Sequence, residues 1–229
     1  AVDVLKAGGS AVDAAIAANA ALGLMEPTGN GIGGDLFAIV WDPKTQQLYG
    51  YNGSGRSPMG RSFEQMEAKI AALKASGAMP ESTIGIPSHG SLSVTVPGAV
   101  DGWFALHDRW GQLPMNRALA DPIRYAEEGF PVTPVIAAGF EGNRQRFSQV
   151  SGMIEELANA EKTYFRGGRA PEAGEIFKNP DLGRTLRAIG EGGRAAFYEE
   201  SIAVAMDEYF RSIGADLTLQ DLQEHEGEW

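Results

Sequence analysis

The hydrophobic side chains at the start of the chain follow a helical period. Between Ala11 and Met25, alanines and larger apolar residues occupy nearly every helical face, so we predict a helix that packs on two sides and is buried. Ser10 is a suitable N-cap for this helix, and Asp13, three residues further on, forms an imperfect capping box with it. Residues 1–7 precede a pair of glycines and predict the end of an earlier helix.

The next apolar stretches have the composition of β-strands. Residues 36–42 and 47–52 combine aliphatic and aromatic side chains over the length of a short strand. The segment between them contains Pro43, Lys44 and Thr45, which suit a tight turn. The pattern therefore predicts an antiparallel hairpin.

Two helices and one more strand are predicted before the middle of the chain. Residues 62–76 and 99–110 carry apolar side chains at helical spacing, and each predicts a helix. Residues 77–90 contain two prolines and show little periodicity, so we expect a loop there. Residues 91–96 alternate polar and apolar side chains, which predicts a strand that the following Pro-Gly pair ends.

From Asn116 onward the pattern is mostly helical. Thr133 is a suitable N-cap, and a proline in the first turn then begins a helix predicted over residues 135–150. Residues 164–180 are rich in glycine and proline and predict an extended surface segment. Three further helices are predicted over residues 182–189, 195–213 and 219–225.

The length and pattern predict one domain over residues 1–229. A chain of 229 residues can bury a sizeable core, and no linker, internal repeat or low-complexity tract divides it. The predicted class is α/β (α+β), with a mixed α/β core over residues 1–112 and a mainly helical part over residues 113–229.

Charge and composition exclude several classes of function. The net charge of −11 argues against nucleic acid as a partner, because no basic face is available to neutralise phosphates. No membrane span is predicted, since the most apolar run, Ala11 to Met25, is interrupted by Asp13 and Asn19 and is shorter than about 20 apolar residues. The absence of cysteine excludes disulfides, thiolate metal sites and cysteine nucleophiles. The chain starts inside a predicted helix, as a trimmed chain would, and the compartment stays open.

A cluster of glycines lies between the second helix and the hairpin. The run contains Gly29, Gly31, Gly33 and Gly34 and superficially resembles a phosphate-binding loop. A nucleotide loop follows a strand and begins a helix, whereas here a helix precedes the glycines and a strand follows them. We therefore predict a closely packed, buried loop rather than a phosphate site.

Arg56 is the candidate binding residue of the sequence. It stands between Gly53-Ser54-Gly55 and Ser57-Pro58, directly after the second predicted strand. A guanidinium group held on such a backbone is suited to bind a carboxylate through two parallel hydrogen bonds. The alternative is an exposed arginine that pairs with an acidic neighbour, which is the commoner situation.

The sequence does not predict a metal site. His89, His107 and His225 are far apart and lack the paired spacing of a metal site. Adjacent carboxylates on a helix diverge and do not share a proton, so we interpret them as solvated faces. These pairs are Glu127 and Glu128, Glu155 and Glu156, and Glu199 and Glu200.

Four stretches, in order, resemble the large subunit of γ-glutamyltranspeptidases, which are N-terminal-nucleophile (Ntn) hydrolases. They are residues 7–58, which include AGGSAVDAAIAANAALGLMEPTGNGIGGDLF and Arg56, residues 94–100, residues 122–130, and residues 196–222. The resemblance implies part of a four-layer αββα sandwich, whose sheets a small subunit from the same precursor completes. It also implies transfer or hydrolysis of γ-glutamyl amides such as glutathione, without a cofactor, and makes Arg56 the ligand of the substrate α-carboxylate.

The catalytic nucleophile of the family is a threonine at the start of the small subunit. No threonine of this chain has the Thr-Thr-His or Thr-Ser-His context of that residue, so we assign no catalytic residue here and expect the small subunit to supply it. The residues around Arg56 also depart from the family, whose members have acidic and apolar neighbours there. Three alternatives stay open: an acylase for another amide, of cephalosporin or poly-γ-glutamate type, a truncated non-catalytic subunit, and an unrelated small-molecule binding domain.

Overall fold

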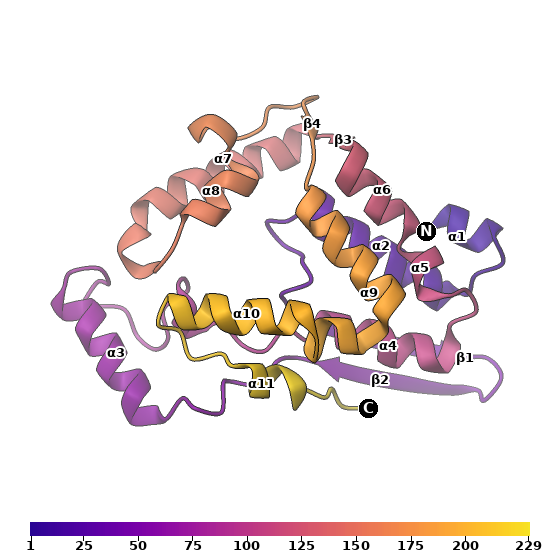
Figure 1. Ribbon diagram of the computed structural model, residues 1–229, viewed down its shortest axis with the longest axis horizontal. Coiled ribbons are helices and arrows are strands. Elements are labelled where there is room, and N and C mark those ends of the chain that lie inside the picture. Colours follow the sequence, from indigo (N-terminus) through magenta and orange to yellow (C-terminus); the bar gives the residue numbers. More distant parts are fainter.

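The computed structural model describes residues 1–229 and shows a mostly helical chain with few, short strands (Figure 1). The helices are α1 (Val2–Lys6), α2 (Ala11–Met25), α3 (Phe63–Ala75), α4 (Ala99–Trp110), α5 (Met115–Ala118), α6 (Ala120–Glu128), α7 (Pro134–Gln149), α8 (Ala158–Tyr164), α9 (Pro180–Tyr198), α10 (Ser201–Ser212) and α11 (Leu219–Gln223). Single 3₁₀ turns are η1 (Ser91–Ser93), η2 (Ser151–Met153) and η3 (Arg166–Gly168). The strands are β1 (Leu36–Asp42), β2 (Gln47–Gly53), β3 (Phe130–Pro131) and β4 (Ile176–Phe177). None of the helices combines the length and the apolar character that crossing a membrane requires.

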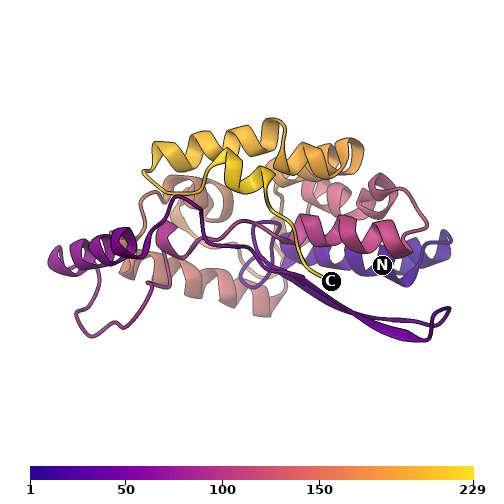
Figure 2. The ribbon, with the colours of Figure 1, turned by 90° about the horizontal axis from the view of Figure 1, so that it is seen from below.

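The expected α/β class is confirmed only in part. Strands β1 and β2 pair with each other in an antiparallel hairpin, and β3 pairs with β4 over two residues. No larger sheet forms within these residues, so helices make up most of the packed structure. The hairpin extends away from the helices at one end (Figure 2), and Phe37, Ile39 and Trp41 of β1 are exposed.

The prediction of a buried, capped α2 is confirmed. The Ser10 hydroxyl accepts a hydrogen bond from the Asp13 backbone N–H at 3.0 Å, and the Asp13 carboxylate accepts one from the Ser10 N–H at 2.8 Å. The same carboxylate accepts from the N–H groups of Gln112 and Leu113, which ties the start of α2 to the loop after α4. Ile16, together with four further apolar side chains of α2, is buried in the core.

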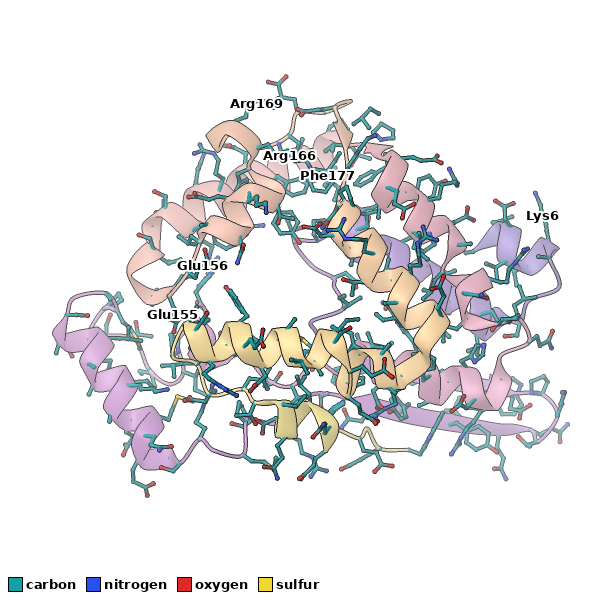
Figure 3. All side chains as sticks on the ribbon, viewed as in Figure 1. Lys6, Glu155, Glu156, Arg166, Arg169 and Phe177 are labelled. Atoms are coloured by element: carbon teal, nitrogen blue, oxygen red, sulfur yellow. The ribbon has the colours of Figure 1, made fainter.

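Two clusters of side chains form most of the core. The larger one joins α2, α4, α5, α6, α9, α10 and α11, and Trp103, Leu119 and Tyr198 are among its fully buried members. The second is rich in aromatic residues and packs α7 against the small β3–β4 sheet, with Phe140 and Phe177 in contact at 5.4 Å between ring centroids. Figure 3 shows Phe177 in this region. The core therefore extends along the chain from α2 to α11.

The predicted strand over residues 91–96 is wrong. Ser91 to Ser93 form the 3₁₀ turn η1, and the segment that follows is extended but has no strand partner. Ser91 and Leu92 are both buried although they are consecutive, because the Ser91 side chain and N–H bind the Glu155 carboxylate. The predicted strand would place Ser91 at an exposed polar position, but Ser91 is buried because it binds the Glu155 carboxylate.

Two helical predictions and one loop prediction also need correction. The helices predicted over residues 182–189 and 195–213 are α9, which continues to Tyr198 across a non-helical Gly193, and α10, which begins at Ser201. Residues 164–180 are not simply a surface segment, since Phe165 and Phe177 are buried and β4 pairs with β3. Aromatic residues anchor this glycine-rich segment to the second core cluster.

Candidate functional site

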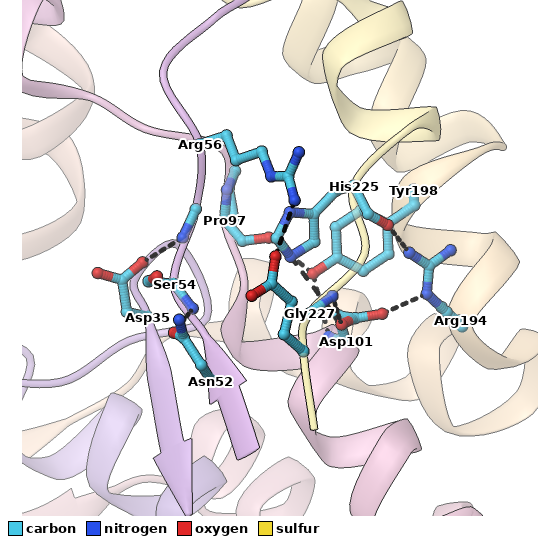
Figure 4. Close-up of polar contacts among 12 residues, drawn as sticks. Asp35, Asn52, Ser54, Arg56, Pro97, Asp101, Arg194, Tyr198, His225 and Gly227 are labelled. Atoms are coloured by element: carbon cyan, nitrogen blue, oxygen red, sulfur yellow. Dashed lines mark hydrogen bonds and ion pairs between the residues drawn. The ribbon is translucent and has the colours of Figure 1, made fainter. Parts of the chain in front are cut away.

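Arg56 lies on an extended segment that follows β2 and crosses the segment before α4 (Figure 4). Its carbonyl oxygen accepts a hydrogen bond from the Val96 N–H at 3.0 Å, and the preceding Gly55 N–H donates to the Asp35 carboxylate at 2.8 Å. A Cβ atom on Gly55 would lie 1.7 Å from the Val96 carbonyl oxygen, so any residue with a side chain would clash at this position. The backbone that carries Arg56 is therefore fixed on both sides.

A second close approach connects this segment to the start of α4. A Cβ atom on Gly98 would lie 1.8 Å from the Gly53 carbonyl oxygen, so this crossing also requires glycine. The N–H groups of Gly98 and Ala99 both donate to the Gly34 carbonyl oxygen, which satisfies donors at the N-terminus of α4. Gly33 and Gly34 are themselves exposed, so the prediction of a buried glycine loop is wrong.

The Arg56 side chain is exposed and paired with a carboxylate of this same chain. Its Nη2 atom donates to Glu228 Oε1 at 3.0 Å, with 77% of the Arg56 side chain and 68% of the Glu228 side chain exposed. The Nε and Nη1 atoms of Arg56 donate no hydrogen bond to the protein. The ion pair that the sequence left as an alternative is thus the contact in the structure, and part of the guanidinium remains available.

The Glu228 backbone is held against β2. It forms an isolated antiparallel bridge with Asn52, in which each residue donates its N–H to the carbonyl oxygen of the other at 2.8 Å. On one side, the Gly227 N–H donates to the buried Asp101 carboxylate at 3.0 Å. On the other, the Trp229 ring packs against Tyr51 at 4.8 Å between centroids.

A cluster of buried polar groups around Asp101 holds the segment that carries Glu228. The Asp101 carboxylate accepts hydrogen bonds from the Tyr51 hydroxyl, from Arg194 Nε at 2.6 Å and from the Gly227 N–H (Figure 4). Arg194 also donates to the carbonyl oxygen of His225. These contacts join β2, α4, α9 and the segment after α11 at one point.

Burial and the neighbouring charge shift the pKa of Asp101 in opposite directions. Burial alone would raise the pKa of Asp101, but the hydrogen bonds from Tyr51 and Arg194 and the charge of Arg194 bring it below its usual range. Burial and the adjacent carboxylate raise the pKa of Tyr51. Asp101 is therefore an ionised, fully paired structural acid, and Tyr51 stays a hydrogen-bond donor.

His225 is buried beside this cluster without a hydrogen-bond partner for either ring nitrogen. Its side chain is 1% exposed and stacks on Tyr198, with 5.6 Å between ring centroids. Burial lowers the pKa of His225; Asp101 opposes this effect, and Arg194 and Arg56 reinforce it. The histidine is consequently neutral in the folded protein near neutral pH.

Acidification from pH 8 to pH 5 is expected to destabilise the protein in part through His225. An unfolded chain protonates this histidine near 6.5, whereas the folded chain does so only at lower pH, so the unfolded state binds more protons and stability falls as the pH falls. The lowered pKa of Asp101 acts only below about 3.8, outside this window. Urea unfolding of the intact gene product at both pH values should show a smaller loss for His225→Phe than for the wild type. Equal losses would exclude the contribution of His225.

The other sequence candidates are not brought together. His107 Nε2 lies 2.7 Å from the Leu113 carbonyl oxygen, and His89 contacts Ser88 and Arg146. No group of three or more histidine, aspartate or glutamate side chains is arranged to hold a metal ion.

Glu155 and Glu156, one of the adjacent carboxylate pairs, lie outside a helix and bind different partners. Figure 3 labels both glutamates. The Glu155 carboxylate accepts a hydrogen bond from the Ser91 hydroxyl, whereas the Glu156 carboxylate accepts one from the Tyr209 hydroxyl at 2.9 Å. The two carboxylates therefore have separate structural partners, which keeps them apart without a shared proton.

Sequence reasoning missed Glu228 and the cluster around Asp101. One signal was available for Asp101, because it lies among Val100, Trp103 and Phe104 on the apolar part of a predicted helix, where an acid needs a partner. Nothing in the sequence indicates that Glu228 reaches Arg56, since 172 residues separate them.

Known proteins are similar to this chain over its whole length. A family model described as Gamma-glutamyltranspeptidase matches residues 1–229. The Glutathione hydrolase-like YwrD proenzyme of Bacillus subtilis (strain 168) is 34% identical over 230 residues, which are 99% of this chain and 39% of that protein. The Oxamate amidohydrolase proenzyme of Klebsiella pneumoniae is 32% identical over 231 residues, which are 98% of this chain and 40% of that protein.

A solved structure is similar to this chain over the same residues. The crystal structure of cephalosporin acylase from Bacillus halodurans has a TM-score of 0.87 and 39% sequence identity to this chain, and the match covers 99% of this chain and 40% of that chain. The chain thus spans about two fifths of the length of these relatives. The match to the family model includes every residue, among them the glycine crossings and Arg56. The chain belongs to the gamma-glutamyltranspeptidase family of Ntn hydrolases, of which it represents a large-subunit portion.

Proposed function

We propose that the complete protein transfers or hydrolyses γ-glutamyl amides of the glutathione type. Family membership supports this function, and so does the naming of several relatives as glutathione hydrolases. The observation that carries the proposal is Arg56, an exposed guanidinium on a backbone fixed at Gly55 and Val96. Such a rigid cation can hold the α-carboxylate of a γ-glutamyl group in one place.

Arg56 has a positioning role in this proposal. A carboxylate bound to the guanidinium fixes one end of the γ-glutamyl chain and thereby directs its γ-carbonyl group to the nucleophile. The free Nε and Nη1 atoms leave donors for this purpose while Nη2 contacts Glu228. The arginine itself forms or breaks no bond.

The nucleophile comes from the partner in this proposal. An N-terminal threonine of the small subunit attacks the γ-carbonyl carbon, and its own α-amine takes the hydroxyl proton and delivers it to the leaving amine. Water or an acceptor amine then attacks the acyl-threonine ester and releases the threonine hydroxyl. Protein groups can supply the nucleophile, the base and the oxyanion donors, so the reaction requires no cofactor.

The partner is a small subunit cut from the same precursor, and it would complete the αββα sandwich. The names of the relatives describe proenzymes, which supports a precursor that is processed. The exposed face of β1 and the groove that it forms with α2, lined by Ile16, Trp103 and other apolar side chains, offer a surface for additional structure. Residues 1–229 would act as one domain in this assembly.

A second candidate is an acylase for a related amide, of cephalosporin or poly-γ-glutamate type. The similarity to the cephalosporin acylase favours it, together with the Gly-Ser-Gly and Ser-Pro residues around Arg56. A truncated, non-catalytic subunit is the remaining alternative.

Turnover of γ-glutamyl-p-nitroanilide by the intact gene product tests the proposed function, with processing followed on a denaturing gel. We expect release of p-nitroaniline together with two bands. Processing without turnover would favour an acylase of other specificity, and an uncut, inactive chain would favour the non-catalytic subunit.

A further inference from the structure

A pocket opens between α7, α8 and the segment that follows α2, and Figure 1 shows the two helices side by side. Its volume is about 300 Å³, at the lower end of the range for small-molecule pockets. Apolar residues make up most of its lining, and no charged side chain takes part. The residues that line this aromatic pocket include Thr28, Phe140, Asn143, Phe147, Ala160 and Tyr164. Its size and lining suit a small, uncharged molecule.

One face of α7 forms a wall of the aromatic pocket. Phe140, Asn143 and Phe147 follow one another at helical spacing, so their side chains lie along the same face of the helix. Phe140 is buried in the second core cluster, whereas Asn143 and Phe147 are partly exposed and can be reached from outside. This face therefore presents an amide between two phenyl rings.

Contacts with buried aromatic residues fix the rings of the pocket. The Phe147 ring meets Phe165 edge to face, with 6.1 Å between centroids. The Tyr164 ring is nearly parallel to that of Phe177, with 6.2 Å between centroids. Phe165 and Phe177 are both buried, so the rings that line the pocket are held by the core. A planar ligand ring could add further contacts of the same favourable kinds.

The Asn143 amide has no hydrogen-bond partner in the protein. Its neighbours on α7 bind one another, because the Glu141 carboxylate accepts hydrogen bonds from Arg144 and Gln145. Asn143 stays outside this group although its side chain offers both a donor and an acceptor. The Tyr164 hydroxyl also lacks a partner, and burial raises its pKa, so it remains protonated. Polar groups are thus available to a ligand inside an otherwise apolar pocket.

The lining of the aromatic pocket indicates one class of ligand. We propose that this pocket binds a small, neutral aromatic molecule whose polar substituent hydrogen-bonds to the Asn143 amide. A charged molecule would lose hydration without gaining a counter-ion, since no charged side chain lines the pocket. An aliphatic molecule would lack the contacts between rings. The site does not use Arg56, so the proposal does not depend on the proposed function.

Ligand-observed fluorine NMR on the intact gene product tests this site with p-fluorophenol, fluorobenzene and p-fluorobenzoate. We expect saturable binding of p-fluorophenol and binding of p-fluorobenzoate that is weaker by about 10-fold or more, because its charge finds no partner. Asn143→Leu keeps a side chain of similar size but removes the hydrogen bond. It should weaken binding of p-fluorophenol about 3- to 10-fold and leave binding of fluorobenzene unchanged.

A second pair of variants tests the location of the site. Ala160→Phe adds a ring to the lining of the pocket and should abolish binding of p-fluorophenol and fluorobenzene. Ala158→Phe is the matched control, because it adds the same ring at an exposed position of α8 that does not line the pocket. This control should leave both affinities unchanged. Circular dichroism shows whether each variant is folded, and if Ala160→Phe is not, the Asn143→Leu comparison decides.

Several results would overturn the proposal. The site is rejected if p-fluorophenol does not bind saturably to the wild type, or if its binding survives Ala160→Phe in a folded protein. An equal effect of Asn143→Leu on p-fluorophenol and fluorobenzene, or no effect on either, would reject the hydrogen bond to Asn143. Equally tight binding of p-fluorobenzoate and p-fluorophenol would reject the neutral class of ligand.

Discussion

Replacement of Asp101 by alanine is expected to lower the free energy of unfolding by about 3–5 kcal/mol. The Asp101 carboxylate is buried and binds Tyr51, Arg194 and the Gly227 N–H, so its removal leaves three donors without an acceptor. The Arg194 guanidinium would lose its close charge partner inside the fold, which is the costly part of breaking such a pair.

Asp108 provides the matched control for this experiment. It lies on the same helix, α4, but it is exposed and has no hydrogen-bonded partner, so Asp108→Ala should change stability by less than about 0.5 kcal/mol. Urea unfolding of the intact gene product measures both variants. Similar midpoints for Asp101→Ala and Asp108→Ala would mean that the cluster does not stabilise the fold.

Replacement of Arg56 by alanine is expected to raise KM for γ-glutamyl amides strongly and to leave self-cleavage intact. A hydrogen-bonded contact to a charged group is worth about 1.5–3 kcal/mol, which corresponds to a loss of about 10- to 150-fold in kcat/KM. Stability should change little, because the Arg56–Glu228 pair is exposed and such pairs contribute about 0–1 kcal/mol.

Arg56→Lys separates charge from geometry at this position. Lysine keeps the positive charge but lacks the planar pair of donors, so we expect activity between that of the alanine variant and that of the wild type. Steady-state kinetics on the processed protein provide both values. Normal turnover of γ-glutamyl amides by Arg56→Ala would rule out the carboxylate-binding role.

Local sequence patterns were sufficient for most of the helices and for the hairpin. The capping box at Ser10 and the turn at Pro43 depend on neighbouring residues, and the structure confirms α2 and the β1–β2 pairing. The strand predicted over residues 91–96 does not form, and the buried Ser91 of that segment is explained by its contact with Glu155, 64 residues away. Periodicity cannot describe a partner so distant in sequence.

The candidate site was predictable only at Arg56. The glycines before Arg56 and the proline after it indicated a rigid arginine. The physical reason is the contact with Val96, about 40 residues away, which the sequence does not show. The Asp101 cluster gathers residues that lie 50, 93 and 126 positions from it. Its assembly depends on the packing of α4 and α9, so no local pattern could place it.

The close backbone approaches at Gly55 and Gly98 also limit where the proposed substrate specificity could be redesigned. Gly55 and Gly98 have no room for a side chain, so a mutant library that varies them would consist largely of misfolded members. Ser54 and Ser57 lie beside Arg56 without buried partners, so their side chains can change while the backbone keeps its path. A focused library at these two serines, screened on several amides, would sample new substrate preferences without a loss of fold.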